Sequence, residues 1–330
     1  MDLLVFACCL VRNIIYGSSI LFTGRLTESV NIFDILALRF LMSFVVLWLL
    51  KTTKILNIKV GVRELLGKNS QSTRKPFVKT ILLAAIFEPV LYMLFETTGI
   101  SMTSNIMAGT ILALAPIFSC ISEELILGEK SSWIKRIFLG IGIVGVLYIT
   151  VNTNTADGKN TIVGILFVLL AVISGCVYSA FSRKASKAFA PIEVTYVSCL
   201  LGTVVFNAVN IVRHLFIGDV ENYFAPYFNL DNMAGFVFLA VLSTIVATLM
   251  GNYTLKKIQL SSNAAFGGIS TLVTVILGVA FNGENLYFYH IIGFSLIFVR
   301  IIGVMLVDRK SNRPSKQNTA RGKREEWSEI

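Results

Sequence analysis

The feature that most constrains this chain is a succession of apolar segments, each long enough to cross a bilayer. A membrane-spanning helix needs about 20 mainly apolar residues, and ten such windows follow one another along the chain. Only 15% of the 330 residues are charged, whereas about 25% is usual in soluble domains. The sequence therefore predicts an all-α integral membrane protein and excludes most soluble enzyme folds. The predicted spans are Leu3–Thr23, Ile32–Leu50, Lys79–Thr98, Ser104–Leu127, Trp133–Val151, Thr161–Ser182, Ile192–Val212, Met233–Asn252, Ser262–Asn282 and Tyr287–Val307.

The ten predicted spans form two sets of five, divided by a polar, turn-prone segment at residues 152–160. Because each set holds an odd number of spans, the second set must cross the membrane in the opposite sense to the first. We therefore predict two inverted repeats, residues 1–151 and 161–307. A basic, hydrophilic tail at 308–330 follows them, and we expect it to be disordered.

The net charge of +10 has a topological explanation. Cytoplasmic loops of membrane proteins are enriched in Lys and Arg, and 23 of the 29 basic residues lie in alternate connections or the tail. The other connections hold only Arg25, Lys159 and Arg213. We predict a multi-pass protein of the cell membrane with both termini in the cytoplasm. Its charge favours a lipid bilayer as partner and gives no reason to expect nucleic acid.

A short internal repeat links the two halves. The segment ISMTSNIMAG at residues 100–109 aligns with IQLSSNAAFG at 258–267. Inverted repeats are typical of secondary transporters, which bind their substrate near the midplane where the repeats meet. The repeat therefore indicates a transport function as well as a fold.

The sequence resembles the EamA domain of the drug/metabolite transporter superfamily. The resemblance extends over about 300 residues, and it is stronger in the first half than in the second. The residues that carry it are Tyr16–Ser18, Leu38–Phe40, Thr103, Ser104, Gly109, Pro116, Leu127–Lys130 and Gly140–Gly145.

This resemblance implies ten helices in two inverted five-helix repeats around a central cavity. Spans one, three, four, six, eight and nine would line the cavity, while spans five and ten would be peripheral. Similar proteins move small metabolites, amino acids, nucleotide sugars or quaternary ammonium compounds, commonly by export or exchange. Where the first half has Pro116 the second has Thr274, which removes the reason for a second helix break there.

Charged residues inside the spans are the strongest candidates for substrate contact, because an ionised side chain at mid-bilayer is costly and usually faces a cavity or a partner. Glu88, Tyr92 and Glu96 are four residues apart and share one helix face. Glu88 and Arg12 each lie nine residues, about 14 Å, from the inner end of a span. We therefore predict that Arg12 and Glu88 pair or share a substrate.

Other intramembrane residues complete the prediction. Tyr16, Tyr92 and Tyr178 could supply aromatic walls suited to a ring or a quaternary ammonium. Arg39 fits a structural position of the family, while Glu123 is expected near the inner surface, in contact with water. The full predicted substrate pathway is Arg12, Asn13, Tyr16, Glu88, Tyr92, Glu96, Tyr178 and Asn263.

Two transport hypotheses follow, together with two from other classes. The first is a secondary transporter that exports a small amphiphilic metabolite, such as an amino acid, by alternating access. The second moves an organic cation, with Glu88 or Glu96 as counter-ion. Either carboxylate is a candidate for proton coupling. A membrane-embedded enzyme is less favoured, because the sequence has no metal-ligand pair, nucleophile motif or phosphate-binding loop. A non-transporting scaffold is less favoured because it would not need polar helix faces that converge on the boundary between the repeats. We expect no cofactor and no metal.

Overall fold

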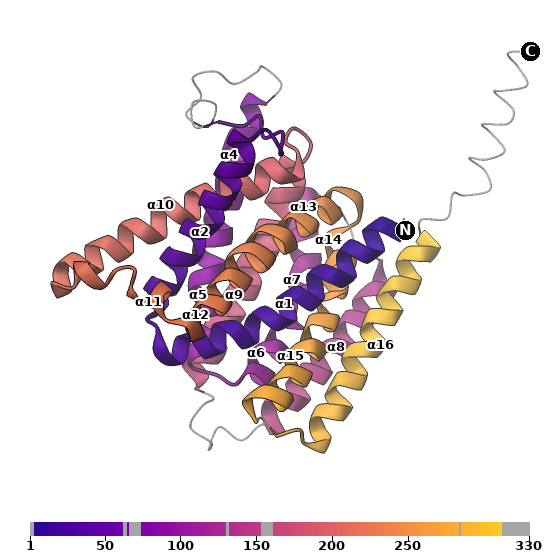
Figure 1. Cartoon of the computed structure of the whole chain (residues 1–330). Coiled ribbons are helices and arrows are strands. Elements are labelled where there is room, and N and C mark those ends of the chain that lie inside the picture. Colours follow the sequence, from indigo (N-terminus) through magenta and orange to yellow (C-terminus); the bar gives the residue numbers. More distant parts are fainter. Residues whose placement is uncertain are drawn as a thin grey trace, which may run out of the picture.

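The computed structural model describes residues 3–61, 65, 74–129, 132–152, 161–283 and 285–311, and within them it contains helices and no β-strand (Figure 1). This confirms the all-α prediction for the described part of the chain. Residues 312–330 of the predicted tail and most of the polar segment at 152–160 lie outside it, whereas residues 308–311 are helical. Within the same part, eight helical segments are long and apolar enough to span a membrane, and Phe288–Val304 is a shorter apolar one. The eight are Leu3–Ser29, Ile32–Thr52, Lys75–Ser101, Asn105–Leu127, Ile162–Ala185, Pro191–Ile217, Asn232–Lys257 and Leu260–Phe281.

Some helical segments of the chain are single α-helices, and others are divided by a local change of helical geometry. The undivided helices are α1 (Leu3–Ser29), α2 (Ile32–Thr52), α8 (Trp133–Asn152), α9 (Ile162–Ala185), α10 (Pro191–Ile217) and α16 (Phe288–Ser311). The divided segments are α4 (Lys75–Ala85), η1 (Ile86–Leu91) and α5 (Tyr92–Ser101); α6 (Asn105–Leu112), α7 (Ala115–Ser122) and η2 (Glu123–Leu127); α12 (Leu230–Val237), η5 (Phe238–Ala247) and α13 (Thr248–Lys257); α14 (Leu260–Ala265) and α15 (Gly267–Asn282). Short turns η4 (Val220–Asn222) and α11 (Ala225–Phe228) precede α12.

The interruption at η1 follows directly from the sequence. Pro89 has no backbone N–H and cannot continue the helical hydrogen-bond ladder. Glu88 before it is extended, with φ −140° and ψ 117°. A wider π-helical stretch, η5, interrupts the corresponding span of the second half. Such segments occur frequently at functional sites, and both of these border the cavity described below.

Both halves also carry an interruption in the span that holds the repeated motif. In the first half the break lies at Ala113 and Leu114, just before Pro116. In the second half it lies at Phe266, between α14 and α15. Around Thr274 the helix is continuous, as its residue type predicts. The break is therefore missing at the position equivalent to Pro116, as expected, and the interruption of this span lies instead at Phe266, closer to the start of the span.

The helices of the two halves make equivalent contacts: a helix of the first half packs on the second half as its counterpart in the second half packs on the first. α1 contacts η5, α13 and α15 of the second half, and α9 correspondingly contacts α4, α5, α6 and α7 of the first. α2 packs on α10, and α8 packs on α16. In Figure 1 the α8–α16 pair lies at one side of the bundle and α10 at the other.

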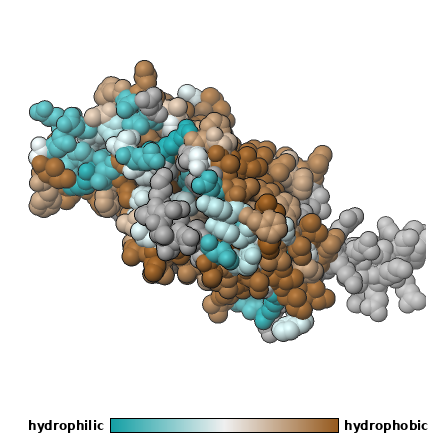
Figure 2. Space-filling view, turned by 90° about the horizontal axis from the view of Figure 1, so that it is seen from below, coloured by the Kyte–Doolittle hydropathy of each residue, from teal (hydrophilic) through white to brown (hydrophobic). Residues whose placement is uncertain are grey.

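The outer surface has the character expected of a membrane protein. In Figure 2 apolar residues cover broad areas of the face seen from below, and hydrophilic residues gather in patches. Large apolar side chains such as Leu147, Leu166 and Val204 are more than half exposed. In water this exposure would be unfavourable, whereas lipid tails solvate it.

Candidate functional site

A cavity of about 160 Å³, with charged and polar side chains in its wall, lies inside the bundle, where helices of the two halves meet. All eight residues of the predicted substrate pathway line it. They come from five elements that are far apart in the sequence. The eight are Arg12, Asn13 and Tyr16 of α1, Glu88 of η1, Tyr92 and Glu96 of α5, Tyr178 of α9, and Asn263 of α14.

The helices around the cavity agree with those that the family resemblance implies. The described lining comes from predicted spans one, three, four, six, eight and nine, with one addition, Arg39 of α2. Within the described residues, α8, α10 and α16 contribute nothing to it. The peripheral position expected for spans five and ten therefore matches the location of α8 and α16.

Arg12 is 8% exposed and is held at the cavity wall by the second half of the chain. Its Nη1 donates a hydrogen bond of 3.1 Å to Oδ1 of Asn263. The same oxygen accepts a 2.8 Å bond from the hydroxyl of Thr254. Cζ of Arg12 lies 5.7 Å from the ring centre of Tyr16, within the range of a cation–π interaction. Its Nε has no hydrogen-bond partner in the structure.

Glu88 lines the same cavity but does not pair with Arg12. Within the described part of the chain, its carboxylate makes no hydrogen bond or ion pair. The predicted direct Arg12–Glu88 contact is therefore absent, because Asn263 holds the guanidinium while the interrupted segment η1 positions the carboxylate separately. Both groups remain available to a solute in the cavity.

The other two charges of the cavity are held within the protein. Glu96 accepts a 2.7 Å hydrogen bond from the hydroxyl of Tyr92, one helical turn away. Arg39 donates from Nε to Thr244, at 2.7 Å, and from Nη2 to Ser243, at 3.1 Å. Arg39, expected at a structural position of the family, also lines the cavity. Its charge inside a span was the signal that could have identified it.

Asn252 is a further residue of the cavity lining, outside the predicted substrate pathway. Its Oδ1 accepts hydrogen bonds of 2.7 Å from Tyr178 and Ser182, and its Nδ2 donates to Thr195 at 3.1 Å. It thereby fixes the position of the Tyr178 hydroxyl. Asn13 instead donates to the backbone oxygen of Cys9 within its own helix, at 2.6 Å.

Glu123 is buried, contrary to the expectation that it would meet water near the inner surface. It is 1% exposed, and its carboxylate accepts hydrogen bonds from the Leu260 amide, at 2.8 Å, and the Ser261 hydroxyl, at 2.7 Å. Gln259, the residue at the N-cap of α14, makes no side-chain cap of its own. Glu123 thus caps a helix of the other half, where a carboxylate is favourable.

Two other predicted intramembrane charges have structural positions. Arg300 is completely buried and does not reach the membrane surface. Its Nη1 donates to the backbone oxygen of Ala113, a carbonyl released by the interruption between α6 and α7. Glu129 pairs with Arg183 at 2.9 Å. Glu284, which follows a glycine in the second half as Glu129 does in the first, lies outside the described residues.

These observations define the class of the protein. Two guanidinium groups and two carboxylates line a cavity enclosed between two halves of a helical membrane protein, the arrangement in which secondary transporters bind solutes. Within the described residues, no group of three or more His, Cys, Asp or Glu side chains could hold a metal ion.

The chain belongs to the EamA-like transporter family, whose sequence profile matches residues 3–151 and again residues 162–306. This family belongs to the drug/metabolite transporter superfamily. YcxC of Bacillus subtilis, named an uncharacterized transporter, is 31% identical over 310 residues, which are 94% of this chain and 95% of that protein. An uncharacterized transporter of Archaeoglobus fulgidus is 25% identical over 256 residues, 78% of this chain and 86% of its own. The family consists of transporters, so the membrane-enzyme alternative is excluded.

The fold is shared with a protein of known crystal structure. The two structures superpose with a TM-score of 0.63 over 93% of this chain and 99% of the other. Their sequences are 17% identical, so the likeness extends to the fold alone.

Proposed function

We propose that this chain is a secondary transporter that exports a small zwitterionic metabolite, such as an amino acid, across the cell membrane by alternating access. In this proposal α8 completes a set of ten spans, arranged as inverted repeats at residues 1–151 and 161–307. Both termini, including the tail at 308–330, are cytoplasmic. The equivalent contacts of α1 with the second half and of α9 with the first half support the repeat arrangement.

The charges of the cavity carry the substrate assignment. Arg39 and Glu96 already have partners, whereas Glu88 has none among the described residues and Arg12 retains an unbonded Nε. A zwitterion would bring its carboxylate to Arg12 and its ammonium to Glu88. Each buried charge would then gain a partner of opposite sign, which offsets the cost of removing both from water.

An organic cation is the second candidate. Tyr16, Tyr92 and Tyr178 all line the cavity, and aromatic faces attract quaternary ammonium groups. The guanidinium of Arg12 next to Tyr16 opposes a solute with only positive charge. That position of Arg12 is the observation that favours the zwitterion.

The capped start of α14 supports closure of the cavity at one end. Leu260, Asn263 and Ala264 line the cavity, and Glu123 holds the backbone of this segment from the other half. In alternating access this contact would break when the cavity opens on that side. A proton carried by Glu88 or Glu96 is the coupling that we propose.

Reconstitution into proteoliposomes tests the function. We expect uptake of unmodified amino acid from a panel that also contains quaternary ammonium compounds. Glu88→Gln should weaken zwitterion binding by about 10- to 100-fold, the usual value of a hydrogen bond to a charged group. Glu28→Gln, at an exposed position outside both this cavity and the other cavities of the described chain, serves as the matched control. Transport of the cations alone would refute the zwitterion assignment, and transport unaffected by collapse of the pH gradient would refute proton coupling.

A further inference from the structure

A second cavity, of about 230 Å³, lies at the ends of several membrane helices, away from the charged central cavity. It is formed by the segment after α2, the residue before α4, the turn between α9 and α10, and the end of α13. Both halves of the chain contribute to it. Four basic residues and a single acidic residue line it, namely Lys59, Arg74, Lys187, Lys256 and Glu193.

The acidic residue is fully engaged by the protein. Glu193 is 1% exposed, and its carboxylate accepts hydrogen bonds from the amides of Val60, at 3.1 Å, and Ala190, at 2.8 Å. Both of its oxygens also receive Arg74 nitrogens at 3.2 Å. Glu193 and Arg74 therefore neutralise each other, and the net charge of the cavity comes from the three lysines.

Those lysines have no counter-charge in the structure. Within its described residues, the side chains of Lys59, Lys187 and Lys256 make no ion pair or hydrogen bond. Three ammonium groups bordering one cavity repel one another, and salt screens this repulsion only over a Debye length of about 8 Å. An anion in the cavity would convert this repulsion into attraction.

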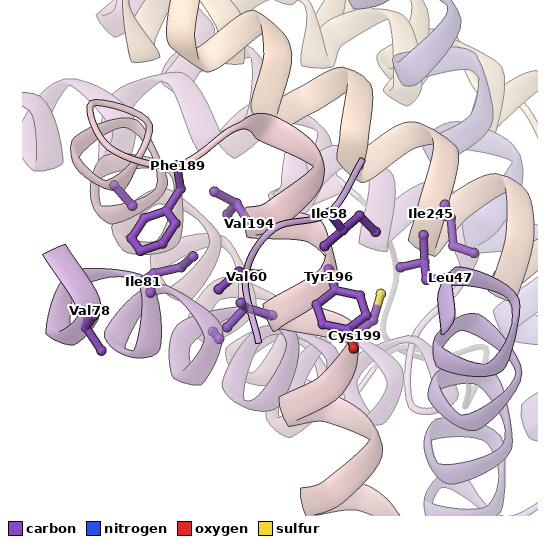
Figure 3. Close-up of a cluster of buried hydrophobic side chains, with 13 residues drawn as sticks. Leu47, Ile58, Val60, Val78, Ile81, Phe189, Val194, Tyr196, Cys199 and Ile245 are labelled. Carbon is purple, nitrogen blue, oxygen red and sulfur yellow. The ribbon is translucent and has the colours of Figure 1, made fainter. Parts of the chain in front are cut away.

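The backbone that carries the lysines is anchored by a hydrophobic core. In the segment after α2, Ile58 and Val60 are buried whereas Asn57 and Lys59 are exposed, the alternation of an extended chain. Figure 3 shows Ile58 and Val60 among the core side chains Val194 and Tyr196. Phe189 anchors the turn that carries Lys187 in the same core. The cavity is therefore built on fixed backbone.

We propose that this cavity binds a phosphate group, supplied either by an anionic phospholipid headgroup or by a free phosphate ion. Lysines bind phosphate as point charges, and basic pockets between membrane helices bind acidic headgroups. The cavity lies where α2 and α13 end and α10 begins, which is the level of lipid headgroups if these helices span the bilayer. A phosphate bound there would join the two halves of the chain.

Binding to the purified full-length protein tests this site. The protein in non-ionic detergent is incubated with equal amounts of phosphatidylglycerol and phosphatidylcholine, and retained lipid is measured by native mass spectrometry. We expect preferential retention of phosphatidylglycerol, reduced about fivefold for each lysine removed in K59Q/K187Q/K256Q. The matched control is K54Q/K184Q/K257Q, which removes three exposed lysines from the neighbouring positions.

A second measurement distinguishes the sources of the phosphate. Inorganic phosphate is titrated into lipid-free protein at millimolar concentration, and the thermal midpoint is followed. A shift that K59Q/K187Q/K256Q abolishes indicates a free phosphate site, and lipid retention without such a shift indicates a headgroup site. Should the triple variant fold poorly, K187Q and K256Q alone carry the same test. Equal binding by the wild type and K59Q/K187Q/K256Q, or an equal loss in the control, would overturn the proposal.

Discussion

The charged residues of the central cavity differ in how many partners the protein gives them. Arg12 is bonded to Asn263, and Glu88 is without a partner among the described residues. An Arg12→Glu, Glu88→Arg double variant would therefore not restore a native ion pair. We expect it to transport no better than either single variant in the proteoliposome assay. Recovery of wild-type transport by the double variant would show that the two residues pair during the cycle.

Asn252 provides a test of the polar network behind Tyr178. Asn252→Ala removes the side-chain oxygen that accepts hydrogen bonds from Tyr178 and Ser182. The two buried hydroxyls then have no acceptor at this position. We expect a loss of about 1–3 kcal/mol in unfolding free energy, measured by denaturant titration in detergent. Asn57→Ala, at an exposed position, should leave stability nearly unchanged. Equal effects of the two substitutions would contradict this account of the network.

The residues of the cavity could be predicted because charge and helical spacing are visible in a sequence. Glu88, Tyr92 and Glu96 share a face by spacing alone, and each lines the cavity. Their partners could not be predicted in the same way. The contact between Arg12 and Asn263 joins residues 251 positions apart, and only the packing of α1 on the second half brings them together.

At the scale of elements, the cap of α14 links the two halves of the chain. Glu123→Ala removes the acceptor of the Leu260 amide and the Ser261 hydroxyl. We expect it to lower unfolding free energy by about 1–3 kcal/mol and to reduce transport. Glu124→Ala is the neighbouring control, since Glu124 pairs with Arg136 in a partly exposed position, and such pairs contribute about 0–1 kcal/mol. A stable Glu123→Ala variant with full transport would contradict the proposed closure.

Close packing of α8 on α16 offers a second test at this scale. A Cβ added to Gly145 would lie 2.8 Å from the backbone oxygen of Gly293, whereas at Gly140 it would meet nothing within 4 Å. Gly145→Ala should therefore destabilise the protein by about 1–3 kcal/mol through overpacking. Gly140→Ala should be neutral or stabilising, because alanine favours a helix over glycine by about 1 kcal/mol. Thermal unfolding of the two variants compares them directly.

The sequence predicts some helix interruptions and not others, for a physical reason. Pro89 and Pro116 each mark a break, since proline removes a backbone donor. The break at Phe266 and the π-helical stretch η5 contain no proline. They depend on contacts with other helices, such as the hydroxyl of Thr244 that bonds both Arg39 and the backbone oxygen of Leu239.

At the scale of the whole molecule, the proposed topology predicts which residues can be reached from each side. Lys59, Lys187 and Lys256 come from three predicted cytoplasmic connections and line one cavity, so these connections lie at the same end of the bundle. In a variant lacking the five native cysteines, Lys187→Cys should react with an impermeant thiol reagent only in inverted vesicles. Asp219→Cys should react in intact cells. The opposite pattern would reverse the orientation of the protein.

The packing of α16 on α8 has a consequence for how the chain is made. α8 ends at Asn152, and its partner begins only at Phe288, so more than a hundred residues must be synthesised before α8 can be covered. The backbone carbonyl of Ala113 likewise cannot accept its hydrogen bond until Arg300 of α16 has been synthesised. A ribosome that stopped before α16 would leave a first half with an exposed glycine face and an uncapped break. Synthesis of α16 therefore completes the folding of the first half.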